Sequence, residues 1–254
     1  MQRRAHDLWR VVKDDPRFCS HGRAVGLAGP ENGTADLQAA TARLQGVCPV
    51  DGVPSADAPG RVLDLENLAL VTDTYVSWRG GMASLAAAKS LLGERGLPSD
   101  LTASFVGQET PGDVLASLDT LTASCEVLLP MGAFLRGVEY PAVVISANDQ
   151  DGRAVGAAAS IAQNHPDHPK AGLAYWGMLA TAPDRRGEGV ALLLGAMALT
   201  EMHARHGFKR FTTGIRAGNA PSEALCAKLS FAPSDERDII AIHPPAFGAE
   251  RMTK

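Results

Sequence analysis

A glycine-rich segment between two strongly patterned stretches constrains this chain more than any other feature. Residues 172–180 have the apolar character of a buried strand, and residues 190–206 form a long apolar helix pattern that ends at Gly207. The connection between them, residues 183–191, is Pro-Asp-Arg-Arg-Gly-Glu-Gly-Val-Ala. Glycines there let the backbone turn closely around a ligand, and the first N–H groups of the following helix attract an anion. We therefore expect a strand, an anion-binding loop and a helix, in that order.

The composition of this loop favours a diphosphate as its occupant. Arg185 and Arg186 add positive charge beside the glycines, whereas Glu188 is expected to point away into solvent. A short glycine motif alone is equally compatible with a strand-to-helix connection that simply needs small residues. The segments that follow it decide between these two interpretations.

A second motif lies downstream, in the order that the first one requires. Residues 208–215 have the pattern of the next strand, and residues 221–229 have that of the next helix. Asn219 precedes this helix, and the sequence Lys-Leu-Ser-Phe at residues 228–231 closes it. Two motifs in the correct order and structural setting are far more specific than either one alone.

With these two motifs the chain resembles the GNAT superfamily of acyl-CoA-dependent N-acyltransferases. The family's pyrophosphate motif is matched by Arg186, Gly189 and Ala191. Its later signature, an asparagine followed by a helix and Lys-Leu-Gly-Phe, is matched except that Ser230 replaces the glycine. The resemblance covers roughly residues 141–243.

The resemblance implies an α/β fold of the α+β type: a mixed, mostly antiparallel central sheet flanked by helices. Two central strands, residues 172–180 and 208–215, would splay apart and admit the pantetheine arm of the cofactor. The residues that the resemblance places against the cofactor are Leu179, Ala180, Thr181, Arg185, Arg186, Gly187, Glu188, Gly189, Val190, Ala191, Asn219 and Ser222.

The activity implied is transfer of an acetyl group from acetyl-CoA to a primary amine of a small molecule or peptide, by direct attack on the thioester. Such a reaction needs a base for the amine and a proton donor for the departing thiolate. Two alternatives stay open: a non-catalytic acyl-CoA-binding or regulatory module, and an aminoacyl or longer-acyl transferase. A homodimer is also left open.

Three residues are candidates for the catalytic chemistry. Cys226 stands where many family members have a tyrosine that protonates the thiolate, although a buried cysteine is more often a small core residue. Ser222 could serve the thiolate or the pantetheine, but serine near a helix start is usually a cap. Tyr175 lies on the strand that enters the site, where an aromatic side chain is more often part of the core.

The first half of the chain allows two domain arrangements. Residues 79–83 open a helix much as residues 186–190 do, which suggests an internal duplication. We expect a degenerate GNAT-like or accessory domain at residues 1–137 and a GNAT acyl-CoA-binding catalytic domain at residues 138–254. The alternative is a single GNAT domain whose first strand and helix lie within residues 101–123, preceded by an extension.

Local patterns in this half predict a helix that starts near residues 8–12, a helix at 35–45, turns across 53–60, a strand at 67–76 and a helix at 82–92. The other expected elements are strands at residues 101–107, 142–147, 154–163 and 238–243 and a helix at residues 111–123.

Composition excludes several other classes of protein. A formal net charge of −4 in 254 residues provides no general attraction to nucleic acid. The four cysteines are widely separated, so we expect no metal site and no disulfide framework. A secretory h-region and a membrane-length apolar stretch are both missing from the sequence, which favours a cytoplasmic protein without membrane contacts.

Overall fold

The computed structural model describes residues 2–248. Its strands are β1 (Phe18–Ser20), β2 (Val25–Leu27), β3 (Val47–Pro54), β4 (Val71–Gly80), β5 (Thr102–Val106), β6 (Ala142–Asn148), β7 (Ala154–Ala162), β8 (Leu173–Thr181), β9 (Arg210–Ile215) and β10 (Ala232–Ile242). Its helices are α1 (Gln2–Val12), α2 (Ala35–Gln45), α3 (Ala58–Asn67), α4 (Met82–Glu94), α5 (Gly112–Ser124), α6 (Gly132–Leu135), α7 (Val190–His206), α8 (Ala220–Lys228) and α9 (Pro244–Phe247), with 3-10 turns η1 (Pro30–Asn32) and η2 (Pro183–Arg185).

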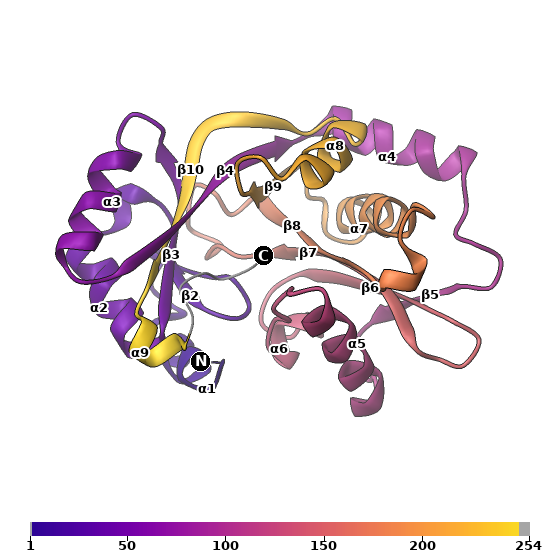
Figure 1. The fold of residues 1–254 in the computed structure, drawn as a ribbon, viewed down its shortest axis with the longest axis horizontal. Helices are drawn as coiled ribbons and strands as arrows, with labels where there is room; N and C mark the ends of the chain where they lie inside the picture. The colour runs from indigo at the N-terminus through magenta and orange to yellow at the C-terminus, as the bar shows by residue number, and fades with distance from the viewer. Residues whose placement is uncertain (1, 249–254) are drawn as a thin grey trace.

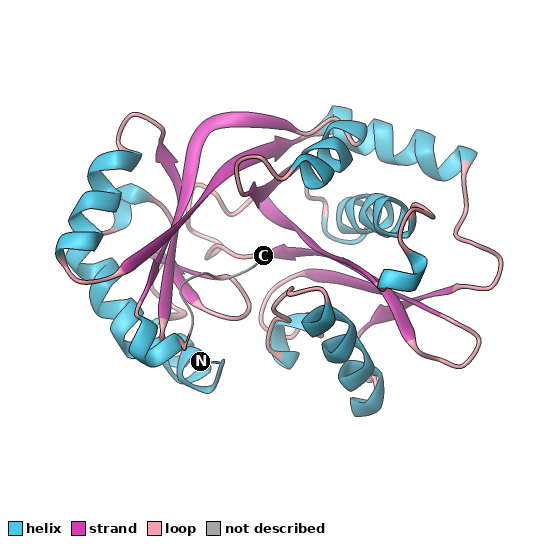
Figure 2. Ribbon diagram, viewed as in Figure 1, coloured by secondary structure: helices cyan, strands magenta, loops and turns pink. Residues whose placement is uncertain are grey.

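These strands join into one sheet in the order β1-β2-β3-β10-β4-β9-β8-β7-β6-β5. Every neighbouring pair is antiparallel except β2 with β3 and β8 with β9. Helices α1, α2 and α3 cover the β3–β10 end, and α7 and α5 lie on opposite faces of the other end (Figure 1). Figure 2 shows the same mixture of helix and strand along the whole chain. The expected mixed, mostly antiparallel sheet flanked by helices is confirmed.

The second half of the chain follows the sequence prediction closely. Helix α7 begins at Val190 and ends at His206, and Gly207 caps it in the left-handed conformation with φ 76°. The strand, loop and helix predicted around residues 183–191 are therefore present. Strands β6 and β7 form the expected hairpin, and β10 is longer than predicted because it starts at Ala232.

The first half departs from the prediction between residues 18 and 76. Two short strands, β1 and β2, were not predicted, and residues 47–54 form the central strand β3 despite Pro49 and Pro54. Residues 58–67 form helix α3, with a proline in its first turn, where the sequence predicted turns. The predicted strand at residues 67–76 was wrong in its start: β4 begins at Val71, because α3 occupies the residues before it.

Strands from the two halves of the chain pair with one another in the sheet. β4, from the first half, pairs with β9 and β10, while β10, from the end of the chain, pairs with β3 of the first half. Two separate apolar cores nevertheless lie along the sheet, one around α7 and β7 and one around α2 and β3. A division at residue 137, in the loop after α6, stays a prediction, as does the internal duplication.

No helix among residues 2–248 combines the length and apolar character needed to cross a membrane.

Candidate active site

The two parallel strands β8 and β9 separate at the centre of the sheet. Only residues 173–175 of β8 pair with residues 210–212 of β9, so both strands lose their common hydrogen bonds toward their carboxyl ends. β8 also carries a bulge: Met178 has φ 57°, and the register with β7 shifts between Ala157 and Ala159. The expected splaying of these strands is therefore present, at the predicted place.

A channel of about 580 Å³ occupies this opening. Its walls come from the carboxyl-terminal half of β8, from the end of β9 with the turn after it, and from one face of α8. The lining includes Tyr175, Leu179, Asn219, Ser222 and Cys226. We call this cavity the strand channel.

Helix α8 is placed by Asn219, whose side-chain oxygen accepts a hydrogen bond from the backbone N–H of Ser222 at 3.4 Å. Ser222 and Cys226 are four residues apart and therefore lie on the same face of the helix, toward the channel. Cys226 is buried, and this burial raises the pKa of its thiol to about 12. The sulfur is thus a neutral S–H group at neutral pH.

A second cavity, of about 330 Å³, lies over the glycine-rich loop and the start of α7. Arg95, Arg186 and Lys228 line it, and among residues 2–248 none of the three forms an ion pair with a carboxylate. Gly187 and Gly189 have φ 86° and 84°, a conformation that favours glycine. We call this cavity the loop cavity; its charge and its exposed helix start suit an anion.

Arg185 has a different role from Arg186. Its guanidinium pairs with Asp100 at 2.6 Å and with Glu188 at 2.9 Å, and its side chain is largely buried. Glu188 is exposed, as expected, and it also pairs with this arginine. The pair fixes the shape of the loop and leaves Arg186 as the arginine available to a ligand.

The close approach of α7 to the sheet depends on a glycine in β7. A Cβ atom on Gly156 would lie 2.5 Å from Val190 Cγ1 and 2.9 Å from Leu194 Cδ1. The missing side chain lets the first turn of α7 pack directly on β7, which brings its N-terminus next to the end of β8.

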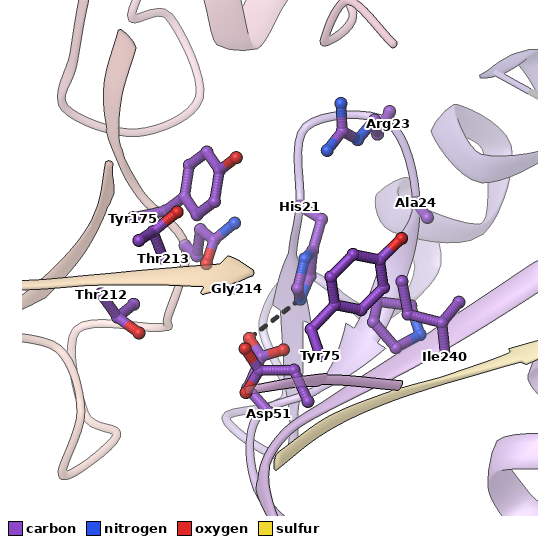
Figure 3. Close-up of a pocket in the computed structure, with 13 residues that line it drawn as sticks. His21, Arg23, Ala24, Asp51, Tyr75, Tyr175, Thr212, Thr213, Gly214 and Ile240 are labelled. Atoms are coloured by element: carbon purple, nitrogen blue, oxygen red, sulfur yellow. Dashed lines mark ion pairs between the residues drawn. The ribbon is translucent and has the colours of Figure 1, made fainter. Parts of the chain in front are cut away.

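A third cavity, of about 130 Å³, lies on the other side of the opening, between β9 and the strands of the first half. Figure 3 shows Tyr175 and Thr213 on one side of it and His21, Asp51 and Tyr75 on the other. It shares its lining residues Arg23, Tyr75, Tyr175, Thr213 and Gly214 with the strand channel. We call it the inner cavity.

The charged or titratable groups of the inner cavity include Arg23, His21, Asp51 and Asp238. His21 Nε2 lies 3.1 Å from Asp51 Oδ2, the ion pair drawn in Figure 3. Burial opposes the charged form of His21, but the Asp51 carboxylate and the nearby Cys19 raise its pKa well above 6.5. Burial likewise opposes ionisation of Asp51, yet His21 lowers its pKa. The pair is therefore charged at neutral pH.

One group of side chains here has the ligand types of a metal site. Cys19, His21 and Asp51 each offer an atom within 4.8 Å of the others. Burial raises the pKa of the Cys19 thiol, so its sulfur stays neutral, and the ring and carboxylate already form an ion pair. We therefore describe these residues as an ion pair beside a buried thiol.

The pKa of Asp238 is shifted in the opposite direction from that of Asp51. Burial, and then the charge of Asp51, raise its pKa from 3.8 to about 7. The folded protein therefore holds a proton that the unfolded chain releases near pH 4. Stability from this group should fall as the pH rises from about 4 to about 7, by at most roughly 1.4 kcal/mol per pH unit, and change no further above that.

We expect Asp238→Asn to remove this part of the pH dependence, because the amide cannot ionise. Urea denaturation of the parent and the variant at pH 5 and pH 7 measures the difference. The variant should be the relatively more stable protein at pH 7. Equal pH dependence of the two proteins would show that Asp238 keeps an ordinary pKa.

Comparison with known proteins adds an independent observation. A model of the acetyltransferase (GNAT) family matches residues 125–231, which include β8, the loop cavity and α8. This part of the chain is a GNAT domain.

Most of the fold also resembles solved structures, two of which are named as GNAT or GCN5-related proteins. A tandem GNAT protein from the clavulanic acid biosynthesis pathway aligns with a TM-score of 0.54 and 16% identity, over 82% of this chain and 67% of that one. A GCN5-related N-acetyltransferase from Kribbella flavida aligns with a TM-score of 0.50 and 14% identity, over 77% and 67%. A Drosophila protein aligns with a TM-score of 0.55 and 19% identity, over 87% and 70%. No curated protein matches the sequence.

The GNAT domain brings most of the predicted site residues together at two neighbouring cavities. Tyr175, Leu179, Asn219, Ser222 and Cys226 line the strand channel. The residues that line the loop cavity are Thr181, Arg185, Arg186, Gly187, Gly189, Val190 and Ala191. Ala180 and Glu188 line neither: Ala180 is buried opposite Ala157 of β7, and Glu188 holds Arg185.

Sequence reasoning missed several residues of the site. Arg95 follows α4 and reaches the loop cavity. His21, directly after β1, Asp51 of β3 and Asp238 of β10 line the inner cavity. Asp238 is the last of four consecutive charged residues, 235–238, that precede the apolar end of β10, so no local pattern distinguishes it from its neighbours. His21 and Asp51 lie in segments that were expected to be irregular, so no pattern pointed to them.

Proposed function

We propose that this chain transfers an acetyl group from acetyl-CoA to a primary amine. The observation that carries this proposal is the continuity along α8. Ser222 and Cys226 face the strand channel, while Pro221, Ala224, Leu225 and Lys228 face the loop cavity. A long ligand with an anionic end and a narrow arm fits this arrangement.

In this proposal the diphosphate of CoA lies in the loop cavity. The N–H groups at the start of α7 and the unpaired cations Arg95, Arg186 and Lys228 supply its partners. The pantetheine arm enters the strand channel beside residues 179–181, where β8 no longer pairs with β9. Backbone N–H groups near the bulge at Met178 would hold the thioester oxygen as negative charge develops on it.

The chemistry then requires a neutral amine on the far side of the thioester. Its nitrogen attacks the acyl carbon, the C–N bond forms, and the C–S bond breaks to release CoA. Because the reaction needs no covalent enzyme intermediate, its groups have only to bind, orient and move protons.

Release of free thiol from acetyl-CoA in the presence of a panel of primary amines tests the proposal. Ethanolamine, putrescine, lysine and glucosamine sample different sizes and charges. Thermal denaturation with and without CoA measures binding separately, because a ligand of the folded state raises the midpoint. We expect stabilisation by CoA and amine-dependent thiol release.

Other outcomes have distinct meanings. Stabilisation without thiol release would favour the acyl-CoA-binding module, for which Cys226 at the expected donor position is the supporting feature. Turnover with longer acyl-CoA donors in preference to acetyl-CoA would favour the longer-acyl transferase. A protein that CoA does not stabilise at all would contradict the transferase assignment.

Cys226 is expected to contribute packing and not proton donation. Burial holds its thiol neutral to about pH 12, and no described charged group lowers that value. We therefore expect Cys226→Ala to lower kcat by far less than the roughly 100-fold that removal of a general acid costs. Steady-state kinetics at pH 7 and pH 9 checks this. A loss of that size in the alanine variant, restored in Cys226→Ser, would make the side chain a donor after all.

A further inference from the structure

We infer that the inner cavity binds the amine substrate as a cation, and that Asp238 takes the proton from its nitrogen. This inference rests on the proposed function, because it concerns the amine that attacks the thioester. It assigns a catalytic residue on β10, outside the GNAT match, and a binding site lined both by residues of the match and by residues outside it.

The inner cavity adjoins the strand channel. It joins the strand channel at Tyr175, Thr213 and Gly214, on the side away from the loop cavity. A molecule there would reach the inner end of the channel while the cofactor diphosphate lies outside, at the start of α7. Its small volume, about 130 Å³, suits a small amine or the amino end of a longer one.

Asp238 is held in a fixed orientation at this junction. Its Oδ1 accepts hydrogen bonds from the Gly52 backbone N–H at 3.1 Å and from Ser77 Oγ at 2.5 Å. Its other oxygen faces β9, because a Cβ on Gly214 would lie 3.0 Å from Oδ2. Gly214 lines both cavities, so its missing side chain leaves Oδ2 open at the place where they meet.

The charges around Asp238 suit an incoming ammonium group. His21 pairs with Asp51, and Arg79 pairs with Glu236, so these cations are already neutralised. The two nearby groups on other elements are Lys170, whose Nζ donates to the backbone oxygens of Ala28 and Asp51, and Arg23, whose guanidinium donates to the backbone oxygen of Leu128. The phenol of Tyr75, which donates to Asp73 Oδ2 at 2.7 Å and accepts from Arg216 at 3.1 Å, completes the wall. Among the described residues, Asp51 has an ion-pair partner in His21, whereas no cation forms an ion pair with Asp238.

The two aspartates thus have separate roles. His21 keeps Asp51 ionised, while burial and the charge of Asp51 raise the pKa of Asp238 to about 7. Two neighbouring carboxyl groups with pKa values pushed apart are typical of acid and base pairs in active sites. A base that titrates near neutral pH can both accept and release a proton during turnover.

The proton balance follows directly. The bound ammonium gives one proton to Asp238 Oδ2 and becomes a neutral amine. Its nitrogen forms the C–N bond as the C–S bond breaks, and the second proton leaves the nitrogen and ends on the CoA sulfur. Asp238 then returns its proton to solvent, so one acetyl-CoA and one ammonium yield one amide, one CoA thiol and one proton.

The variant Asp238→Asn tests this role, with Asp235→Asn as the matched control on the same strand, where the side chain is exposed. With acetyl-CoA and whichever of the four panel amines the parent uses fastest, we expect kcat to fall about 100-fold or more in Asp238→Asn. CoA binding should not change. The parent should gain kcat/KM as the pH rises to about 7, and the variant should lack this rise; the control should match the parent in both.

A second variant separates catalysis from structure. Asp51→Asn removes the charge that helps to raise the pKa of Asp238, so the rise of kcat/KM should move to lower pH. If Asp238 had only a structural role, replacing Asp51 would not change the pH at which kcat/KM rises. If kcat/KM of Asp51→Asn rises at the same pH as that of the parent, or if Asp238→Asn has a normal kcat, the assignment of Asp238 is wrong.

Failure of this inference can be told apart from failure of the proposed function. If a panel amine is acetylated but Asp238→Asn keeps the kcat and the pH profile of the parent, the inference is wrong and the proposed function stands. If CoA stabilises the protein but no panel amine is acetylated, transfer to an amine, and with it the proposed function, is wrong. If CoA does not bind, the proposed function itself fails.

Discussion

Gly189→Ala is expected to weaken CoA binding at least about tenfold, which corresponds to roughly 1.4 kcal/mol. Gly189 ends the loop in the left-handed conformation, with φ 84°, and caps the start of α7. A Cβ there would lie 3.3 Å from Arg95 Nη2 and inside the loop cavity. The methyl group would occupy space meant for the diphosphate and would turn the first N–H groups of α7 away from it. Isothermal titration with CoA measures the effect.

Gly207→Ala is the matched control for this experiment. Gly207 caps the other end of the same helix with φ 76°, and a Cβ there meets nothing within 4 Å. Both variants therefore carry the same left-handed alanine strain, roughly 1–2 kcal/mol of stability. Only Gly189→Ala should lose affinity for CoA. Equal affinities in the two variants would show that the start of α7 does not bind the cofactor.

Trp176→Ala is expected to lower the free energy of unfolding by about 3–5 kcal/mol. Trp176 lies on β8 and is 1% exposed. Its ring stacks on Phe231 with centroids 4.7 Å apart, and its Nε1 donates to the backbone oxygen of Gly195 at 2.9 Å. One side chain thus ties β8 to α7 and to the segment after α8, the three elements that frame the channel. Urea denaturation measures the loss.

Trp176→Phe separates packing from the hydrogen bond. The smaller ring keeps a stacking partner for Phe231 but removes the indole N–H that donates to the Gly195 oxygen, and loss of this second hydrogen bond should cost about 0.5–1.5 kcal/mol. The phenylalanine variant should therefore lie between the parent and the alanine variant. Gly195 itself shows how closely the indole packs, since a Cβ there would lie 2.7 Å from Trp176 Cζ2. An alanine variant as stable as the parent would contradict this description of the core.

Prediction from sequence succeeded where the signal was local. The loop at residues 186–191 and the helix start at Asn219 were found because a glycine turn, a helix cap and an anion-binding N-terminus involve residues close together in the chain. Prediction failed at the end of β3, where Pro54 indicated a turn when only neighbours are considered, and no element was predicted for residues 47–52. Pairing of β3 with β10, nearly two hundred residues away, overrides that preference.

The sequence by itself determined the strand, loop and helix that form the loop cavity and the resemblance to the GNAT family, since each depends on short-range spacing. Only the tertiary structure decided which carboxylate faces the opening between β8 and β9. His21, Asp51 and Asp238 come from β1, β3 and β10 or the residues next to them, and they meet because β10 pairs with β3 while β4 pairs with β9. Strand pairing of this kind is set by long-range burial and register, which leave no periodic trace in the residues that it brings together.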